Sequence, residues 1–218
     1  MNPALIAIVL AIGAGAVVAV STRDGAAAAI GLAVSLLASA LLAEPLPSVG
    51  ILGVRIVAAL LVATLIRSAM RAGARQPSPL GWPSEAFLAT AGAVAGLGIA
   101  VGLAAVTAAG GVPVGGGGEP GVGGPIDAGS AALTSMALTT AAGTSLLVLG
   151  IAPFIHGQPG ARRAIGLVLI TQAVLLLRIG IAGPAVELEE IARAALLVVA
   201  GATGAALARA AAASMTPT

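Results

Sequence analysis

Long apolar runs follow one another along the whole chain and are separated by short stretches that carry charges, glycine or proline. Each run is about as long as the roughly 20 residues that a helix needs to cross the hydrocarbon core of a bilayer. Apolar and polar residues do not alternate strictly, so the pattern predicts helices rather than the strands of a membrane barrel. We therefore predict an all-α, polytopic helix bundle with seven spans, at residues 3–20, 25–42, 48–70, 84–109, 130–154, 164–182 and 191–212.

Composition supports a membrane protein and excludes several other classes. Hydrophobic residues make up 59% of the 218-residue chain, and charged residues only 8%. Soluble domains carry about 25% charged residues, so this chain has too few to cover the surface of a soluble globule. The net charge is +2, and no basic stripe is present. These values exclude a soluble enzyme, a disordered chain and a nucleic-acid-binding protein.

Charges in the connections predict the orientation. Cytoplasmic loops are enriched in basic residues, so arginine counts can be compared between alternate connections. One set, with the C-terminal end, holds seven of the ten arginines: Arg23, Arg67, Arg71, Arg75, Arg162, Arg163 and Arg209. The other set holds six of the eight carboxylates: Glu44, Glu119, Asp127, Glu187, Glu189 and Glu190. We expect the N-terminus outside and the C-terminus inside.

Residues 110–129 divide the chain, because half of this segment is glycine. A phosphate-binding loop would need a preceding strand and a following Gly-Lys-Ser/Thr, and both are missing. We interpret residues 110–129 as a flexible external linker between a four-helix half, residues 1–109, and a three-helix half, residues 130–218. The sequence shows no convincing repeat between these halves.

No catalytic, cofactor or metal site is predicted in this chain. Cysteine is absent, His156 is the single histidine, and no cluster of His, Asp and Glu has the spacing of metal ligands. No carboxylate lies in the middle of a span, where the proton relay of a pump normally sits. The candidates for an ion path are polar residues within the last three spans and at their ends, together with one arginine of the third: Arg55, Thr171, Gln172, Arg178, Glu187, Glu189, Glu190 and Arg193.

The arginines among these candidates have two interpretations. Either they reach to the external interface and pair with the nearby carboxylates, or they line an ion path. Glu189 and Arg193 are one helical turn apart, at i,i+4. We expect Arg178 to pair with one of the three glutamates or with an acidic residue of a neighbouring subunit.

The three-helix half resembles a known family. The run IGLVLITQAV at residues 165–174 resembles the middle helix of subunit K of respiratory complex I and its antiporter relatives. Gly166 and the Gln172-Ala173 pair fit that pattern, whereas Val168 stands where the family has a glutamate. The acidic residues 187–190, the small residues 195–204 and the closing Ala208-Arg209 resemble the last helix of the same family.

With its additional N-terminal helices, the chain is similar in length and layout to component E of hydrogenase-4-type and formate-hydrogenlyase-type complexes. Residues 56–62, followed by Arg71-Ala72, match the third helix of that family and its basic end. The resemblance implies a non-catalytic subunit of a complex-I-like oxidoreductase in a bacterial or archaeal plasma membrane. It also implies antiporter-like and other membrane-arm subunits as partners in the lipid bilayer, with metals and flavins held by other chains and no cofactor in this one.

Two other functions stay open. The first is a small secondary transporter or permease component, a class that often carries inverted repeats and a charged site at the bilayer midplane. The second is a structural scaffold of another membrane complex, which the abundant small residues would equally allow.

Overall fold

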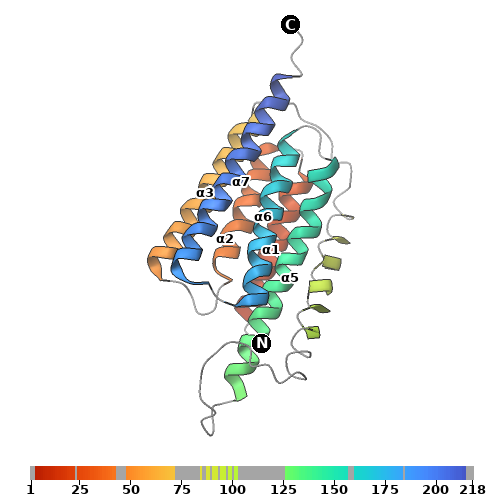
Figure 1. The fold of residues 1–218 in the computed structure, drawn as a ribbon. Helices are drawn as coiled ribbons and strands as arrows, with labels where there is room; N and C mark the ends of the chain where they lie inside the picture. The colour runs from red at the N-terminus through yellow and green to blue at the C-terminus, as the bar shows by residue number, and fades with distance from the viewer. Residues whose placement is uncertain are drawn as a thin grey trace.

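The computed structural model describes residues 3–22, 24–42, 48–71, 126–156, 160–183 and 185–214, together with 84, 87–88, 90–92, 94–96, 98–99 and 101–102. The helices with assigned bounds are α1 (Pro3–Ser21), α2 (Gly25–Ala40), α3 (Val49–Arg71), α5 (Ile126–His156), α6 (Gly160–Ala182) and α7 (Glu187–Ala213). The described residues between 84 and 102 are also helical, and this segment runs alongside α5 (Figure 1). No strand occurs in these ranges, which confirms the all-α class.

Five helices are long and apolar enough to cross a membrane: α1, α3, α6, α7 and residues Ser135–Ile155 of α5. The shorter α2 is also apolar and has 16 residues. Large apolar side chains such as Leu10, Val57 and Val199 are more than half exposed on the outside of the bundle. Lipid is the medium that accommodates such a surface, and the chain is therefore a multi-pass membrane protein by the length and composition of its helices.

Three helices begin four residues before the predicted spans. α5 begins at Ile126 instead of residue 130, α6 at Gly160 instead of 164, and α7 at Glu187 instead of 191. Charged residues mark where the chain leaves the apolar layer, but a helix can extend beyond that layer. The helix dipole favours the glutamates in the first turn of α7, and α6 includes Arg162 and Arg163 in its first turn. Residues 126–129 of the predicted linker are consequently helical, and residues 110–125 lie outside the described ranges.

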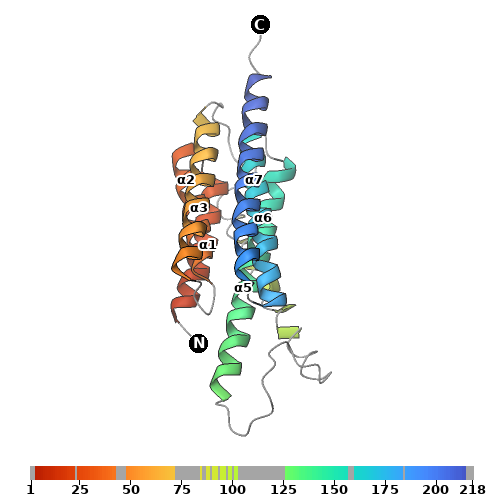
Figure 2. The same cartoon turned by 60° about the vertical axis from the view of Figure 1, so that its left-hand side comes forward.

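The helices form two layers, α1–α2–α3 and α5–α6–α7 (Figure 2). Within each layer the middle helix packs against both neighbours. Between the layers, α3 packs against α7 and α1 against α5, whereas the middle helices α2 and α6 contact each other only slightly. Fully buried leucines and isoleucines from both layers make up the core, among them Ile12, Leu32, Ile66, Leu146 and Leu169.

The two layers are alike in the order of their helices (Figure 2), and we call them the two repeats. The motif GAxxAIGL occurs at residues 25–32, where α2 begins, and again at 160–167, where α6 begins. The same spacing of 135 residues separates the ends of α1 and α5, at Ser21 and His156. It also aligns residues 55–61 of α3 with 190–196 of α7, which share Ile, Ala and Leu at matching places.

Equivalent glycines make equivalent contacts in the two repeats. A Cβ on Gly15 would lie 2.7 Å from both Gly31 O and Ser35 N, so α1 and α2 touch backbone to backbone. At the corresponding place, a Cβ on Gly150 would lie 3.0 Å from Gly166 O and 3.1 Å from Ile170 N. Small residues allow such close approach of helices in lipid. The contact geometry identifies the repeat, which the alanine-rich sequence conceals.

The repeats run in the same direction. Along the contact between α3 and α7, Arg55 meets Glu190 near the start of both helices, and Ser68 accepts a hydrogen bond from Arg209 near their ends. α3 and α7 are therefore parallel, as Figure 1 also shows. The arrangement is a parallel repeat and not the inverted repeat that many transporters use.

Candidate functional site

The end of α2 and the beginning of α3 create the first part of the site. α2 ends at Ala40, and the last carbonyl groups of a helix lack partners within the helix and carry partial negative charge. The Arg55 guanidinium donates from Nη1 to Ala40 O at 3.0 Å. Arg55 lies six residues, or about 9 Å along the axis, after the start of α3. It therefore caps α2 from the neighbouring helix.

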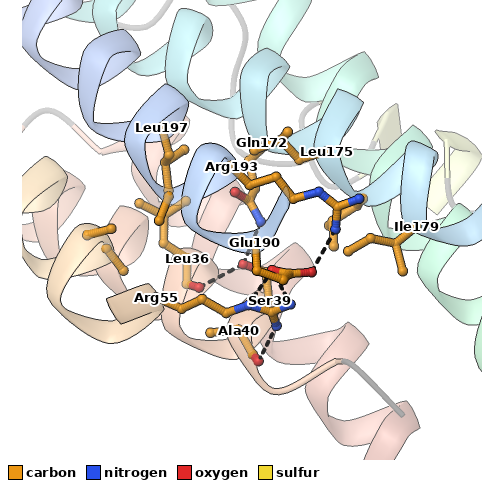
Figure 3. Close-up of a pocket in the computed structure, with 14 residues that line it drawn as sticks. Leu36, Ser39, Ala40, Arg55, Gln172, Leu175, Ile179, Glu190, Arg193 and Leu197 are labelled. Atoms are coloured by element: carbon orange, nitrogen blue, oxygen red, sulfur yellow. Dashed lines mark hydrogen bonds and ion pairs between the residues drawn. The ribbon is translucent and has the colours of Figure 1, made fainter. Parts of the chain in front are cut away.

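Glu190 lies between two arginines. Arg55 donates from Nε to Glu190 Oε2 at 2.9 Å, and Arg193 donates from Nη1 to Glu190 Oε1 at 2.9 Å (Figure 3). Each carboxylate oxygen thus accepts from a different guanidinium. Glu190 also belongs to the first turn of α7, where the helix dipole favours a negative side chain. These contacts supply both counter-charges and hydrogen-bond donors to a carboxylate whose side chain is only 8% exposed.

The series of charges continues to the rim of the bundle. Arg193 donates from Nη2 to Glu189 Oε1 at 2.7 Å, and Arg178 donates from Nη2 to Glu189 Oε2 at 2.6 Å. Arg178 also donates to the carbonyl of Gly183, the left-handed residue (φ +84°) that ends α6. We call the resulting series the ion network; along it, positive and negative groups alternate in the order Arg55, Glu190, Arg193, Glu189, Arg178.

Exposure rises along the ion network from Glu190 to Arg178, and at its other end the side chain of Arg55 is 13% exposed. The side chains of Glu190 and Arg193 are 8% and 9% exposed, whereas Glu189 is 29% and Arg178 40% exposed. The network therefore leads from the rim of the bundle, at the end where α3 and α7 begin, to a buried position between the two layers. Its three guanidinium groups and two carboxylates leave a charge of +1.

A small cavity lies where the ion network ends. It has a volume of about 50 Å³ and is bounded by α2, α3, α6 and α7. Its polar lining consists of Arg55, Glu190, Arg193 and a hydrogen-bonded pair in which Gln172 Nε2 donates to Ser39 Oγ at 2.7 Å. The loose contact between the middle helices of the two repeats leaves the space for this cavity (Figure 3).

The structure brings six of the eight predicted residues together. Arg55, Arg178, Arg193, Glu189 and Glu190 form the ion network, and Gln172 lines the cavity beside it. The expected pairing of Arg178 with one of the glutamates is confirmed, and so is the i,i+4 pair of Glu189 and Arg193. Arg55 and Glu190 pair across 135 residues of sequence.

Two predicted residues lie apart from the site. Thr171 Oγ1 donates to Leu167 O of its own helix at 2.9 Å and does not line the cavity. Glu187 is exposed at the first residue of α7, and no described residue forms a hydrogen bond or ion pair with it.

Sequence reasoning missed Ser39 and the Ala40 carbonyl. Serine in an apolar helix usually donates to its own backbone, and Ser39 Oγ does so to Leu36 O at 2.7 Å. Only the proximity of α6 makes it the partner of Gln172 as well. The signal that could have found this region is the repeated GAxxAIGL motif, because it aligns α2 with α6 and Arg55 with Glu190.

The chemistry available to this arrangement is limited to charge pairing and hydrogen bonding. Within the described residues, no group of three or more His, Cys, Asp or Glu residues could hold a metal ion. Both oxygens of Glu190 are already occupied by guanidinium donors, so this carboxylate is held as an ion-pair partner and not as a free base.

Comparisons of the chain with protein-family models, with curated proteins and with solved structures find no match.

Proposed function

We propose that this chain is a non-catalytic integral membrane subunit of a complex-I-like or group 4 hydrogenase-like oxidoreductase in a bacterial or archaeal plasma membrane. In this role it bridges antiporter-like subunits and supports ion translocation. The observation that carries the proposal is the place of the subunit-K-like residues 165–174. They form the centre of α6, the middle helix of the second repeat, and bring Gln172 to the cavity.

The repeat strengthens this proposal. Because α2 begins with the same GAxxAIGL motif as α6, each layer presents a middle helix of related sequence. The chain then corresponds to two three-helix units of subunit-K type in one polypeptide. Two such units in parallel offer two similar outer faces, which suits a subunit that bridges larger neighbours.

The distribution of charge favours a supporting role over a proton relay of its own. Every ionisable residue in the described helices lies within about two turns of a helix end. A relay through the membrane interior needs protonatable side chains at mid-depth. We therefore propose that the principal proton path lies in neighbouring subunits.

We propose a topology of seven spans with the N-terminus outside. The parallel direction of the two repeats supports an odd number of spans. A unit of three spans that starts outside ends inside. For the second unit to run in the same direction, the connection from α3 to α5 would cross the bilayer an odd number of times. We propose that the segment containing the described helical residues between 84 and 102 is one such crossing.

Affinity purification tests the function. A tagged copy expressed at its native level is extracted from native membranes in mild detergent, and the co-purifying chains are identified by mass spectrometry. We expect antiporter-like subunits together with hydrogenase-like or dehydrogenase-like subunits. Recovery of the chain alone or as a homodimer would refute the proposal, and recovery with an unrelated membrane complex would favour the scaffold function.

A small secondary transporter is the second candidate, and the repeat is the observation that favours it. Some transporters consist of parallel repeats, with the substrate site at the repeat interface near the bilayer midplane. The cavity between α2 and α6 lies at the interface of the two repeats, toward the end of the bundle where α3 and α7 begin. A chain that purifies alone and catalyses solute flux in proteoliposomes would establish this function in place of the first.

A further inference from the structure

The cavity between the two repeats contains hydrogen-bonding groups that the described residues do not satisfy. Gln172 donates to Ser39, but its amide carbonyl accepts no hydrogen bond from any described residue. Exchange of the amide O and N atoms would not remove the deficit, because one of the two atoms would still lack a partner. The Gln172 residue is only 8% exposed and lines the cavity, so water in the cavity is the partner available to this atom.

Arg55 also has spare donors beside the cavity. A guanidinium has five N–H groups. Glu190 accepts from Nε and forms an ion pair with Nη2, and Ala40 O accepts from Nη1. Two N–H groups remain without a partner among the described residues. Burial of polar groups without partners is costly, and lipid supplies neither donors nor acceptors.

The size of the cavity matches what these groups need. A site must offer about 10–15 Å³ of comparable volume to hold one water molecule. The cavity of about 50 Å³ therefore has room for about three. A buried water typically forms about three hydrogen bonds, and the lining offers donors from Arg55 and Gln172 and acceptors from Gln172 and Glu190.

We propose that the cavity between α2 and α6 binds a small cluster of water molecules, connected to the aqueous phase along the ion network. The rising exposure from Glu190 to Arg178 marks the direction from which the water enters. Because the network carries a charge of +1, the site binds water and repels metal cations. The inference deepens the proposed function, and it rests on that function only for the role of the water within an ion-translocating complex.

Hydroxyl-radical footprinting of the detergent-solubilised protein, in whatever assembly it purifies, tests the inference. Radicals generated from water modify buried side chains only where water is bound nearby, and peptide mass spectrometry locates the modification. Leu36 and Leu176 line the cavity, whereas Leu32 and Leu169 are similarly buried and do not line it. Leu188, 77% exposed, serves as the positive control.

We expect modification of Leu36 and Leu176 at least five-fold above that of Leu32 and Leu169. Gln172→Leu removes the polar atoms that hold the water and should reduce modification of the two lining leucines to the level of the buried controls. Thr171→Val is the matched control, since Thr171 bonds to its own helix, and should leave the pattern unchanged. Equal modification of lining and control leucines would overturn the proposal.

The outcome is independent of the partners. If the chain purifies alone and Leu36 and Leu176 are modified, the hydrated cavity is supported and the proposed complex is refuted. If the chain purifies in the complex and Leu36 and Leu176 are not modified, the proposed function is supported and the hydrated cavity is refuted.

Discussion

Arg55 and Glu190 occupy equivalent positions in the two repeats and form an ion pair with each other, Nε to Oε2 at 2.9 Å. Equivalent positions of the two layers thus carry opposite charges. Because Arg55 also donates to the end of α2 and Glu190 also accepts from Arg193, the pair connects three helices. It joins the two layers of the bundle at the end where α3 and α7 begin.

The first prediction concerns this pair. Glu190→Ala removes the carboxylate that pairs with Arg55 and should lower the free energy of unfolding by about 3–5 kcal/mol, whereas Arg55→Ala leaves Glu190 paired with Arg193 and should cost less. The double substitution Arg55→Leu with Glu190→Leu should cost at least about 1 kcal/mol less than the sum of the two single leucine substitutions, since the residues are coupled. Denaturant unfolding in detergent, followed by circular dichroism, measures each value. Additive losses would show that the two side chains act independently.

The second prediction concerns Arg178 at the rim. Its side chain is 40% exposed and that of its partner Glu189 29%, so water screens the pair and Arg193 keeps Glu189 neutralised when Arg178 is removed. Arg178→Ala should therefore reduce the free energy of unfolding by less than about 1 kcal/mol. The same unfolding assay, repeated at raised salt, should show a smaller difference still. A loss comparable to that of Glu190→Ala would mean that Arg178 is buried in the assembly.

The third prediction concerns the close contact between α1 and α2. A Cβ on Gly15 would lie 2.7 Å from backbone atoms of α2, so Gly15→Ala must separate the two helices and should cost about 1–3 kcal/mol. Gly13 is the matched control, because nothing lies within 4 Å of the Cβ it would gain. Gly13→Ala should leave the melting temperature unchanged or slightly raised. Equal melting temperatures for the two variants would contradict the observed helix contact.

The fourth prediction concerns topology and uses the absence of cysteine from the chain. A cysteine at Gly117 should react with a membrane-impermeant thiol reagent added to intact cells, whereas a cysteine at Gln76 should react only after the membrane is opened. The reason is that the connection around Gly117 carries carboxylates and the one around Gln76 carries arginines. The opposite pattern would overturn the proposed orientation, and labelling of both from outside would overturn the span count.

Local features of the sequence were sufficient to predict the helices and part of the ion network. Apolar runs of spanning length identify helices, because backbone groups in lipid must bond within their own segment. Glu189 and Arg193 could be paired from sequence alone, because residues four apart share one face of a helix. Arg178 was expected to find a glutamate because a short turn joins α6 to α7.

Only the tertiary structure could show the pairing of the two layers. Arg55 and Glu190, and likewise Ser39 and Gln172, are more than 130 residues apart, and no local pattern specifies that α3 lies beside α7 or α2 across from α6. The repeat was hidden for a related reason: in a chain so rich in alanine and glycine, a few shared residues stand out little from the background. Packing distinguishes them, because Gly15 contacts α2 and Gly150 contacts α6 at equivalent backbone positions. The sequence by itself therefore determined a membrane-spanning helical chain with its charges near the helix ends, whereas the assembly of the buried network and its cavity depended on how two similar layers pack.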